Sequence, residues 1–370
     1  MVELIKHGVY LLDGQKVVED TTGMPSADEA RENTITYGIL RAHDVNGGKG
    51  KEMHIRFDAM MSHDITYVGI IQTARASGLT KFPLPYAMTN CHNSLCAVAG
   101  TINEDDHVFG LSAAKKYGGI YVPANQAVIH QFAREEMVKC GNMILGSDSH
   151  TRYGSLGNMG VGEGGGELVK QLLRNTWDIN APEVVLVWLE GTPRHGIGPH
   201  DVAISLVKAV FESGFVKNKV LEFAGPGVAN LSVDFRNGID VMTTETTCLS
   251  SIWVTDEKVR EHYELHRRPE DYKELRPGKV AYYDSMVRID LSKQESMIAL
   301  PYHPSNAVSI HELQADPETV LRRVEEDTKR RFGDKVHPDL VSKIRNGKVY
   351  ADQGIIAGCS GGTYENLCEA

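Results

Sequence analysis

The feature that most constrains the fold is a repeated alternation of short apolar runs with segments of helical periodicity. Apolar runs at residues 120–122, 143–145 and 184–189 have the length of buried strands, and helical patterns occupy residues 105–117 and 126–139 beside them. Strands that alternate with helices of this length are typical of βαβ units, whose strands pair in parallel. The sequence therefore predicts an α/β fold, with consecutive α/β/α domains and mostly parallel sheets.

Polar or reactive loops are expected after three predicted strands. One follows an extended run at residues 82–88, one follows the strand at 143–145, and one carries Cys359 after a predicted strand at 349–356. In open α/β sheets ligands bind outside the carboxyl ends of the strands, so the three loops are expected to meet at one cleft. Cys359 stands in a glycine turn before a predicted helix, where the helix dipole would favour a thiolate. The alternative interpretation of Cys359 is a small buried hydrophobic residue.

A second glycine-rich segment matches the letters of a dinucleotide-binding motif. Gly160, Gly162 and Gly165 have the GxGxxG spacing and stand before a predicted helix at 167–175. The motif should leave a strand directly, whereas the nearest predicted strand ends at Leu145. The sequence therefore favours a helix N-terminus that faces an anionic ligand over a dinucleotide site.

Composition excludes several classes of function. The 370 residues carry a net charge of −10 and no long block of like charges, so no nucleic-acid partner is expected. The longest clean apolar run, at residues 184–189, is far shorter than a bilayer span, and no membrane partner is expected. The N-terminus has no signal-peptide pattern, and the 6 cysteines of this long chain do not form a disulfide framework. Reduced thiols and a cytoplasmic location are therefore expected.

Considered singly, the candidate site residues each have an ordinary structural interpretation. His130 could be a helix histidine with satisfied hydrogen bonds, and Glu245 could be a surface carboxylate. The turn Asp148-Ser149-His150 could be an Asx-type turn. This turn does not predict a serine hydrolase, because adjacent residues in one turn cannot form the Ser-His-Asp relay and no GxSxG elbow is present.

Taken together and in this order, the motifs resemble those of the aconitase superfamily over residues 55–370. The resemblance rests on the turn at Asp148 and His150 after a strand, on the Gly-Cys-Ser-Gly-Gly-Thr-Tyr-Glu-Asn turn that contains Cys359, and on Glu245 between them. It implies an aconitase-like fold and a hydro-lyase that interconverts hydroxy-acids and enoic acids on a [4Fe-4S] cluster. The sequence is similar to a divergent, hydratase-like branch. Further matches lie at residues 128–131 and 225–227.

The resemblance also implies roles for individual residues. Cys359 would be the first of three thiolates that hold the cluster. Carboxylate–imidazole pairs would surround the cluster iron, and such a pair can move a proton at the substrate oxygen because the carboxylate fixes the histidine tautomer. The pairs would be Asp148 with His130 and His150 with Glu245, and His92 would be a further catalytic residue. The implied residues that bind a small di- or tricarboxylic hydroxy-acid are His63, Asp64, Ser149 and Asn93.

Two departures from the family pattern leave the function open. The family has an Asp-His pair where this chain has His92-Asn93, and an asparagine cannot carry a proton. The cysteine turn continues with Ser-Gly-Gly-Thr at residues 360–363, where the family has Thr-Asn-Ser-Ser. The main alternative is therefore a ligand- or cluster-sensing binding protein that keeps the fold without catalysis. A zinc enzyme with His and Cys ligands ranks last because the ligand spacings do not fit.

Length sets the last expectation. Three domains are predicted, at residues 1–192, 193–300 and 301–370, the third of them incomplete. In the family, two further cluster cysteines, the substrate-binding arginines and a catalytic serine come from later segments that these 370 residues do not contain. We therefore expect a truncated fragment that holds no intact cluster and turns over nothing by itself. The sequence does not predict the oligomeric state.

Overall fold

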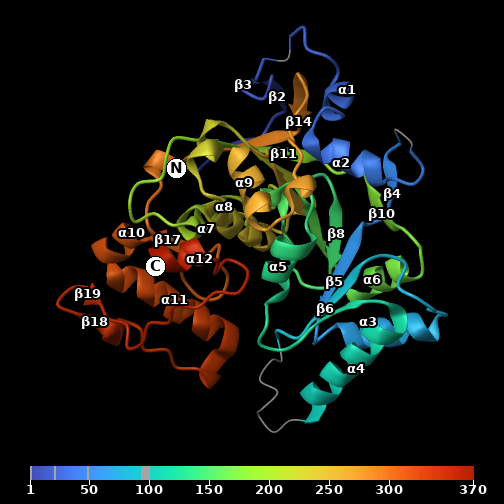
Figure 1. Cartoon of the computed structure of the whole chain (residues 1–370). Helices are drawn as coiled ribbons and strands as arrows, with labels where there is room; N and C mark the ends of the chain where they lie inside the picture. Colours follow the sequence, from blue (N-terminus) through green and yellow to red (C-terminus); the bar gives the residue numbers. More distant parts are fainter. Residues whose placement is uncertain (1, 21, 48–49, 93–100) are drawn as a thin grey trace.

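Two parallel sheets form the centre of the molecule (Figure 1). The computed structural model describes residues 2–20, 22–47, 50–92 and 101–370. All five strands of the first sheet run parallel, in the order β7-β6-β5-β8-β9. Its strands are β5 (Ala59–His63), β6 (Tyr86–Thr89), β7 (Ile120–Val122), β8 (Met143–Gly146) and β9 (Met159–Gly162). The central strands are buried along their whole length, as expected for a parallel sheet covered on both faces.

Helices connect and cover the strands of the first sheet. Helices α3 (Tyr67–Ala76) and α6 (Gly165–Leu172) pack against each other, and α4 (Thr101–Tyr117) packs against α3 and β7. The helix predicted at 126–139 is only partly correct, because α5 (Ile129–Phe132) continues as a single π-helical turn, Ala133–Met137. Such π-helical turns are rare and occur mostly at functional sites.

The second sheet has five strands in the order β1-β15-β11-β12-β13, and all pairs are parallel except β1 with β15. Helix α2 (Ile35–His43) contacts β12, whereas α7 (Pro199–Val210) contacts β1 and packs on α8 (Val233–Met242). The α/β class with mostly parallel sheets is therefore confirmed. The strands are β1 (Val2–Ile5), β11 (Val184–Glu190), β12 (Val220–Ala224), β13 (Ser250–Trp253) and β15 (Ser285–Asp290).

One hydrophobic core runs through both sheets, whose edge strands β9 and β13 lie against each other. Strands β1 and β11 fall in the predicted first domain but pair with strands of the second, so this sheet draws on both sides of residue 192. The division into three domains stays a prediction. Smaller antiparallel pieces flank the core: β2 (Val9–Leu12), β3 (Lys16–Val18) and β14 (Val280–Tyr283) form one sheet, and β4 (Glu52–Ile55) pairs with β10 (Trp177–Asn180). Helices α1 (Ala27–Arg31) and α9 (Glu257–Leu265) complete this part.

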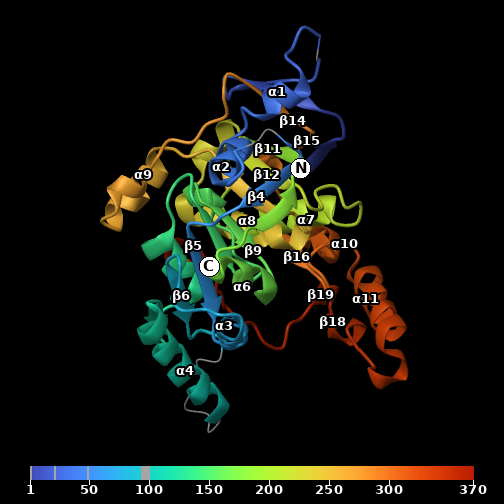
Figure 2. The ribbon, with the colours of Figure 1, turned by 90° about the vertical axis from the view of Figure 1, so that its right-hand side faces the viewer.

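The C-terminal segment has its own small core and lies beside α7 and α8 (Figures 1 and 2). Strands β16 (Met297–Ala299) and β17 (Ala307–Ser309) form a hairpin under the helices α10 (Ile310–Ala315) and α11 (Pro317–Phe332). The chain ends in α12 (Tyr364–Glu369), which docks on α8 through two hydrogen bonds from residues 365 and 366 to Asp234. None of the described helices combines the length and apolar character that a membrane crossing needs.

The strand predicted at 349–356 is wrong. Strand β19 (Lys348–Val349) pairs only with β18 (Ile344–Arg345), and the residues after it are irregular. Ile355 and Ile356 are 78% and 72% exposed, so this apolar run has no sheet to join. An apolar run of this length forms a strand only where a partner strand accepts its backbone hydrogen bonds, and here none of the described strands lies beside it.

Candidate functional site

The predicted site loops leave three neighbouring strands of the first sheet. His63 ends β5, His92 follows β6, and Asp148 follows β8. Strand β5 lies between β6 and β8, and all three run parallel, so their carboxyl ends meet at one edge. Of the three loops predicted to share a cleft, those after β6 and β8 meet at this edge through the contact of His92 with Asp148. The loops after β8 and around Cys359 both line a cavity, although no strand precedes the Cys359 loop.

Asp148 is the centre of this edge because four imidazoles surround its carboxylate. The Nε2 atom of His130 is 3.1 Å from Oδ1, the distance predicted for a hydrogen-bonded pair. The Nε2 atoms of His92 and His63 lie 3.4 and 3.7 Å from Oδ2. His150 donates its backbone N–H to Oδ1 at 2.7 Å, and its Nδ1 is 3.5 Å from the same oxygen. Burial alone would raise the pKa of Asp148, but its contacts with His130, His150 and His92 outweigh it and hold that pKa below its usual range.

The second predicted pair is also in contact. The Nε2 atom of His150 is 3.2 Å from Oε1 of Glu245, which sits in the 3₁₀ turn Thr243–Thr246 before β13. Thr244 ties this turn to the Asp148 loop, since its hydroxyl donates to the carbonyl of Ser149 at 2.7 Å. The hydrogen bonds of Asp148 and Glu245 raise the pKa of His150 to about 9, and His150 in turn lowers the pKa of Glu245.

The imidazoles around Asp148 differ in charge because they differ in burial. Burial lowers the pKa of His130, which is 1% exposed, despite its contact with Asp148. Burial and the neighbouring His92 lower the pKa of His63 to about 4. The hydrogen bonds of Asp148 and Cys91 raise the pKa of His92 to about 10, although its ring lies 3.8 Å from that of His63. At neutral pH the cluster therefore holds charged imidazoles beside neutral ones, an arrangement that separates acid from base.

Two further predicted residues have simpler positions. Asp64 is buried beside His63 and accepts a hydrogen bond from the backbone N–H of His92 at 3.0 Å. Ser149 is exposed in the Asp148 turn. Asn93 lies outside the described residues.

Cys359 lies at the wall of a cavity of about 860 Å³ that His150 also lines. The turn around it is tight, since a Cβ on Gly358 would come within 2.6 Å of the Gly362 Cα atom. The expected lowering of the thiol pKa is wrong: desolvation at the cavity wall, followed by the charges of Cys91 and Asp148, raises the pKa of Cys359. The dipole of the helix that starts at Tyr364 does not offset this increase in the thiol pKa.

Arg134 connects the cysteine turn to the imidazole cluster, and sequence reasoning missed it. Its guanidinium donates to the carbonyl of Ser360, while His130, one helical turn earlier on the same element, contacts Asp148. Arg134 is 1% exposed, and burial lowers its pKa. The only sign of this residue in the sequence was a charged side chain in the middle of the helix predicted at 126–139. His303 was also missed; its Nε2 atom lies 3.9 Å from Oε2 of Glu245, and the residue stands between β16 and β17.

The glycine motif at residues 160–165 serves the site in another way than expected. The argument that no strand precedes it is wrong, because Gly160 and Gly162 belong to β9 and α6 begins at Gly165. A Cβ on Gly162 would lie 2.4 Å from the carbonyl oxygen of Asp148 and 3.0 Å from the Ser149 Cα atom. The glycine therefore lets the Asp148 turn pack directly on β9.

A carboxylate among imidazoles at the carboxyl ends of parallel strands defines the class: an α/β protein with an acid–base site. The chain belongs to the aconitase family, because the model of the "Aconitase family (aconitate hydratase)" matches residues 37–370. The chain is 26% identical to the 3-isopropylmalate dehydratase large subunit 1 of Thermotoga maritima over 76% of this chain and 68% of that protein. It is 30% identical to the mitochondrial aconitate hydratase of Aspergillus fumigatus over 60% of this chain and 29% of that protein.

The large subunit 2 of 3-isopropylmalate dehydratase from Archaeoglobus fulgidus is a third relative, 29% identical over 57% of this chain and 50% of its own length. Apart from the Thermotoga protein, the chain spans half or less of the length of these curated relatives. The activity of a whole relative is therefore a matter for proposal.

Proposed function

We propose that this chain carries the acid–base groups of a hydro-lyase of the aconitase type, which removes water from a small di- or tricarboxylic hydroxy-acid or adds it back. The observation that carries the proposal is that one turn, residues 148–150, supplies members of two carboxylate–imidazole pairs. The cavity beside this turn is also lined by cationic side chains, among them Arg194 and Lys258. These cations suit a substrate with more than one carboxylate.

Each residue has a role that follows from its environment. His150, with a pKa of about 9, holds a positive charge and an exchangeable proton at the cavity wall, where a leaving hydroxyl would need them. Glu245 keeps that imidazole oriented. His130 holds Asp148 in place from the buried side, and His92 lies beside the same carboxylate on its more exposed side. His63, Asp64 and Ser149 would contact the rest of the substrate.

A [4Fe-4S] cluster is part of the proposal, with Cys359 as one of its thiolates. When bound, such a cluster supplies a Lewis-acidic iron for the substrate hydroxyl. The cysteine turn fits one corner of a cluster, because Cys359 is exposed at the cavity wall and the chain turns tightly between Gly358 and Gly362. Buried Cys140 and Cys248 instead donate to the backbone carbonyls of Leu156 and Thr243, so we do not propose them as cluster ligands.

The test is the variant Asp148→Asn in the protein reconstituted with iron and sulfide without oxygen. We expect kcat for dehydration of a hydroxy-acid to fall at least about 100-fold, because a neutral amide in place of the carboxylate cannot hold the imidazole charges, while the free energy of unfolding changes by about 1 kcal/mol. Formation of the enoic acid is followed by ultraviolet absorbance. Asp178→Asn is the control, since Asp178 pairs with His54 at an exposed site.

Two results would contradict the proposal. If turnover and stability fell together in Asp148→Asn, the residue would be structural. If the wild-type protein bound hydroxy-acids by calorimetry but turned none of them over, the chain would belong to a binding protein that keeps the fold.

A further inference from the structure

His63, Asp64 and His92 form a compact group of possible metal ligands. One ligand atom from each of these residues lies within 4.8 Å of the others. We propose that these residues form a site for one divalent transition-metal ion, separate from the cysteine turn. This inference goes beyond the proposed function, because hydro-lyase chemistry at the Asp148 pairs does not require such a site.

The backbone brings the three ligands together before any metal binds. His63 ends β5 and pairs in register with Thr89, the last residue of β6, and His92 stands three residues after Thr89 (Figure 1). Asp64 follows His63 directly. Since β5 and β6 are hydrogen-bonded neighbours in a buried sheet, the ligands depend on rigid strands, which favours a preorganised site.

The environment of the His63 imidazole is the main argument for a bound metal ion. Its side chain is 8% exposed, and its Nδ1 atom has no hydrogen-bond partner among the described residues. Its Nε2 atom is 3.7 Å from Asp148 Oδ2, beyond hydrogen-bond distance. A buried imidazole without hydrogen bonds costs stability, and a metal ion would satisfy it. A metal ion at His92 would replace the proton of that imidazole, because a ligating histidine must be neutral.

The second ligand is held by its own contacts. The Asp64 side chain is fully buried and accepts the backbone N–H of His92 at 3.0 Å, so the two ligands are already coupled. The Nε2 atom of His107, on α4, lies 3.5 Å from the other carboxylate oxygen. This nitrogen makes no hydrogen bond within the described residues, so of these two groups it is the backbone N–H of His92 that orients Asp64.

The donor set indicates the class of metal. Two imidazoles and one carboxylate suit Zn²⁺, Fe²⁺, Co²⁺ or Mn²⁺ and leave coordination positions open. They do not suit an iron–sulfur cluster, which thiolates hold. The carboxylate of Asp148, 3.4 Å from His92 and 3.7 Å from His63, offers a further oxygen beside the group.

The experiment is a titration of the metal-free chain with Co²⁺, followed by visible absorbance and calorimetry, and repeated with Zn²⁺. We expect one equivalent of Co²⁺ to bind and His63→Gln and His92→Gln each to weaken binding at least about 100-fold. The control His337→Gln changes a histidine on the exposed C-terminal segment and should leave the affinity unchanged. Cys359→Ser should also leave it unchanged, which separates this site from a cluster.

Several outcomes would overturn the site. They are the absence of stoichiometric binding in the wild type, binding that persists in both histidine variants, and binding that is lost in Cys359→Ser. Circular dichroism shows whether His63→Gln is folded. His92→Gln keeps the test valid if it is not, since that side chain is 30% exposed. Loss of turnover in Asp148→Asn together with no Co²⁺ binding would reject this site while supporting the proposed function.

Discussion

Asp148 and Glu222 are two carboxylates removed from solvent at strand positions, yet their surroundings differ completely. Glu222, in the middle of β12, is fully buried and accepts hydrogen bonds from the backbone N–H groups of Ile35 and Thr36, from the Thr36 hydroxyl and from the Tyr283 hydroxyl. Asp148, at the end of β8, faces imidazoles instead. Burial raises the pKa of Glu222 despite its four hydrogen bonds, whereas the imidazoles lower the pKa of Asp148.

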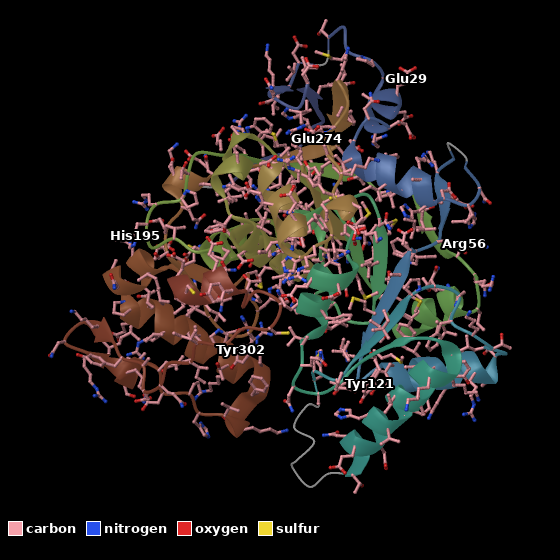
Figure 3. The ribbon with its side chains drawn as sticks, viewed as in Figure 1. Glu29, Arg56, Tyr121, His195, Glu274 and Tyr302 are labelled. Atoms are coloured by element: carbon pink, nitrogen blue, oxygen red, sulfur yellow. The ribbon has the colours of Figure 1, made fainter. Side chains whose placement is uncertain are left out.

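The difference teaches that the partners of a buried carboxylate, and not its burial, indicate its role. The donors around Glu222 cannot titrate near neutral pH, so they join the start of α2 to the second sheet and do nothing else. The partners of Asp148 can each gain or lose a proton. Figure 3 labels His195, which lies on the loop between β11 and α7 and lines the same cavity as His150.

The largest expected effect is on stability and concerns the structural carboxylate. Glu222→Leu should lower the free energy of unfolding by about 4 kcal/mol, because it leaves buried donors of Ile35, Thr36 and Tyr283 without an acceptor. Urea denaturation measures the change, with Asp148→Asn beside it. The comparison fails if the leucine variant is the more stable of the two.

A smaller loss of stability is expected at Gly162, whose backbone packs against the Asp148 turn. Gly162→Ala places a Cβ 2.4 Å from the Asp148 carbonyl oxygen and should cost about 2 kcal/mol, because two backbone segments must separate. The matched control is Gly164→Ala, where nothing lies within 4 Å of the added carbon. Thermal unfolding compares the two variants. Equal melting temperatures would mean that the Asp148 turn tolerates displacement.

The smallest effect is a dependence of stability on pH. The folded pKa values of His92 and His150, about 10 and about 9, exceed their unfolded value of 6.5. Their contribution is therefore fully present below pH ~6.5 and is lost as the pH rises through ~9 to ~10. After allowance for solvent screening we expect a loss of about 1 kcal/mol, measured by urea denaturation across this range.

Asp148→Asn should remove most of this alkaline loss, whereas Glu222→Gln should keep it. An unchanged alkaline slope in Asp148→Asn would show that the imidazole charges do not depend on this carboxylate. The raised pKa of Glu222 makes a separate contribution to stability, which is lost as the pH rises from the unfolded value of 4.5 towards its folded pKa.

Much of the fold could be predicted because local pattern and tertiary structure agree there. The runs at β7, β8 and β11 are short and apolar, so periodicity alone located them, and those at β8 and β11 are buried. The contacts of His130 with Asp148 and of His150 with Glu245 also agree with the prediction. Residues 349–356 were misjudged because an apolar run does not show whether a partner strand exists. The pKa of the Cys359 thiol was misjudged because desolvation at the cavity wall, followed by the charges of Cys91 and Asp148, outweighs the effect of the nearby helix start.

The sequence by itself determined the alternation of strands and helices, and with it the polar loops at strand ends, since these depend on near neighbours in the chain. Only the tertiary structure decided which imidazoles carry charge, how Arg134 reaches Ser360, and that His63, Asp64 and His92 converge. The physical reason is that protonation and ligand geometry depend on burial and on distances between residues far apart in the chain. Local periodicity contains no information about either.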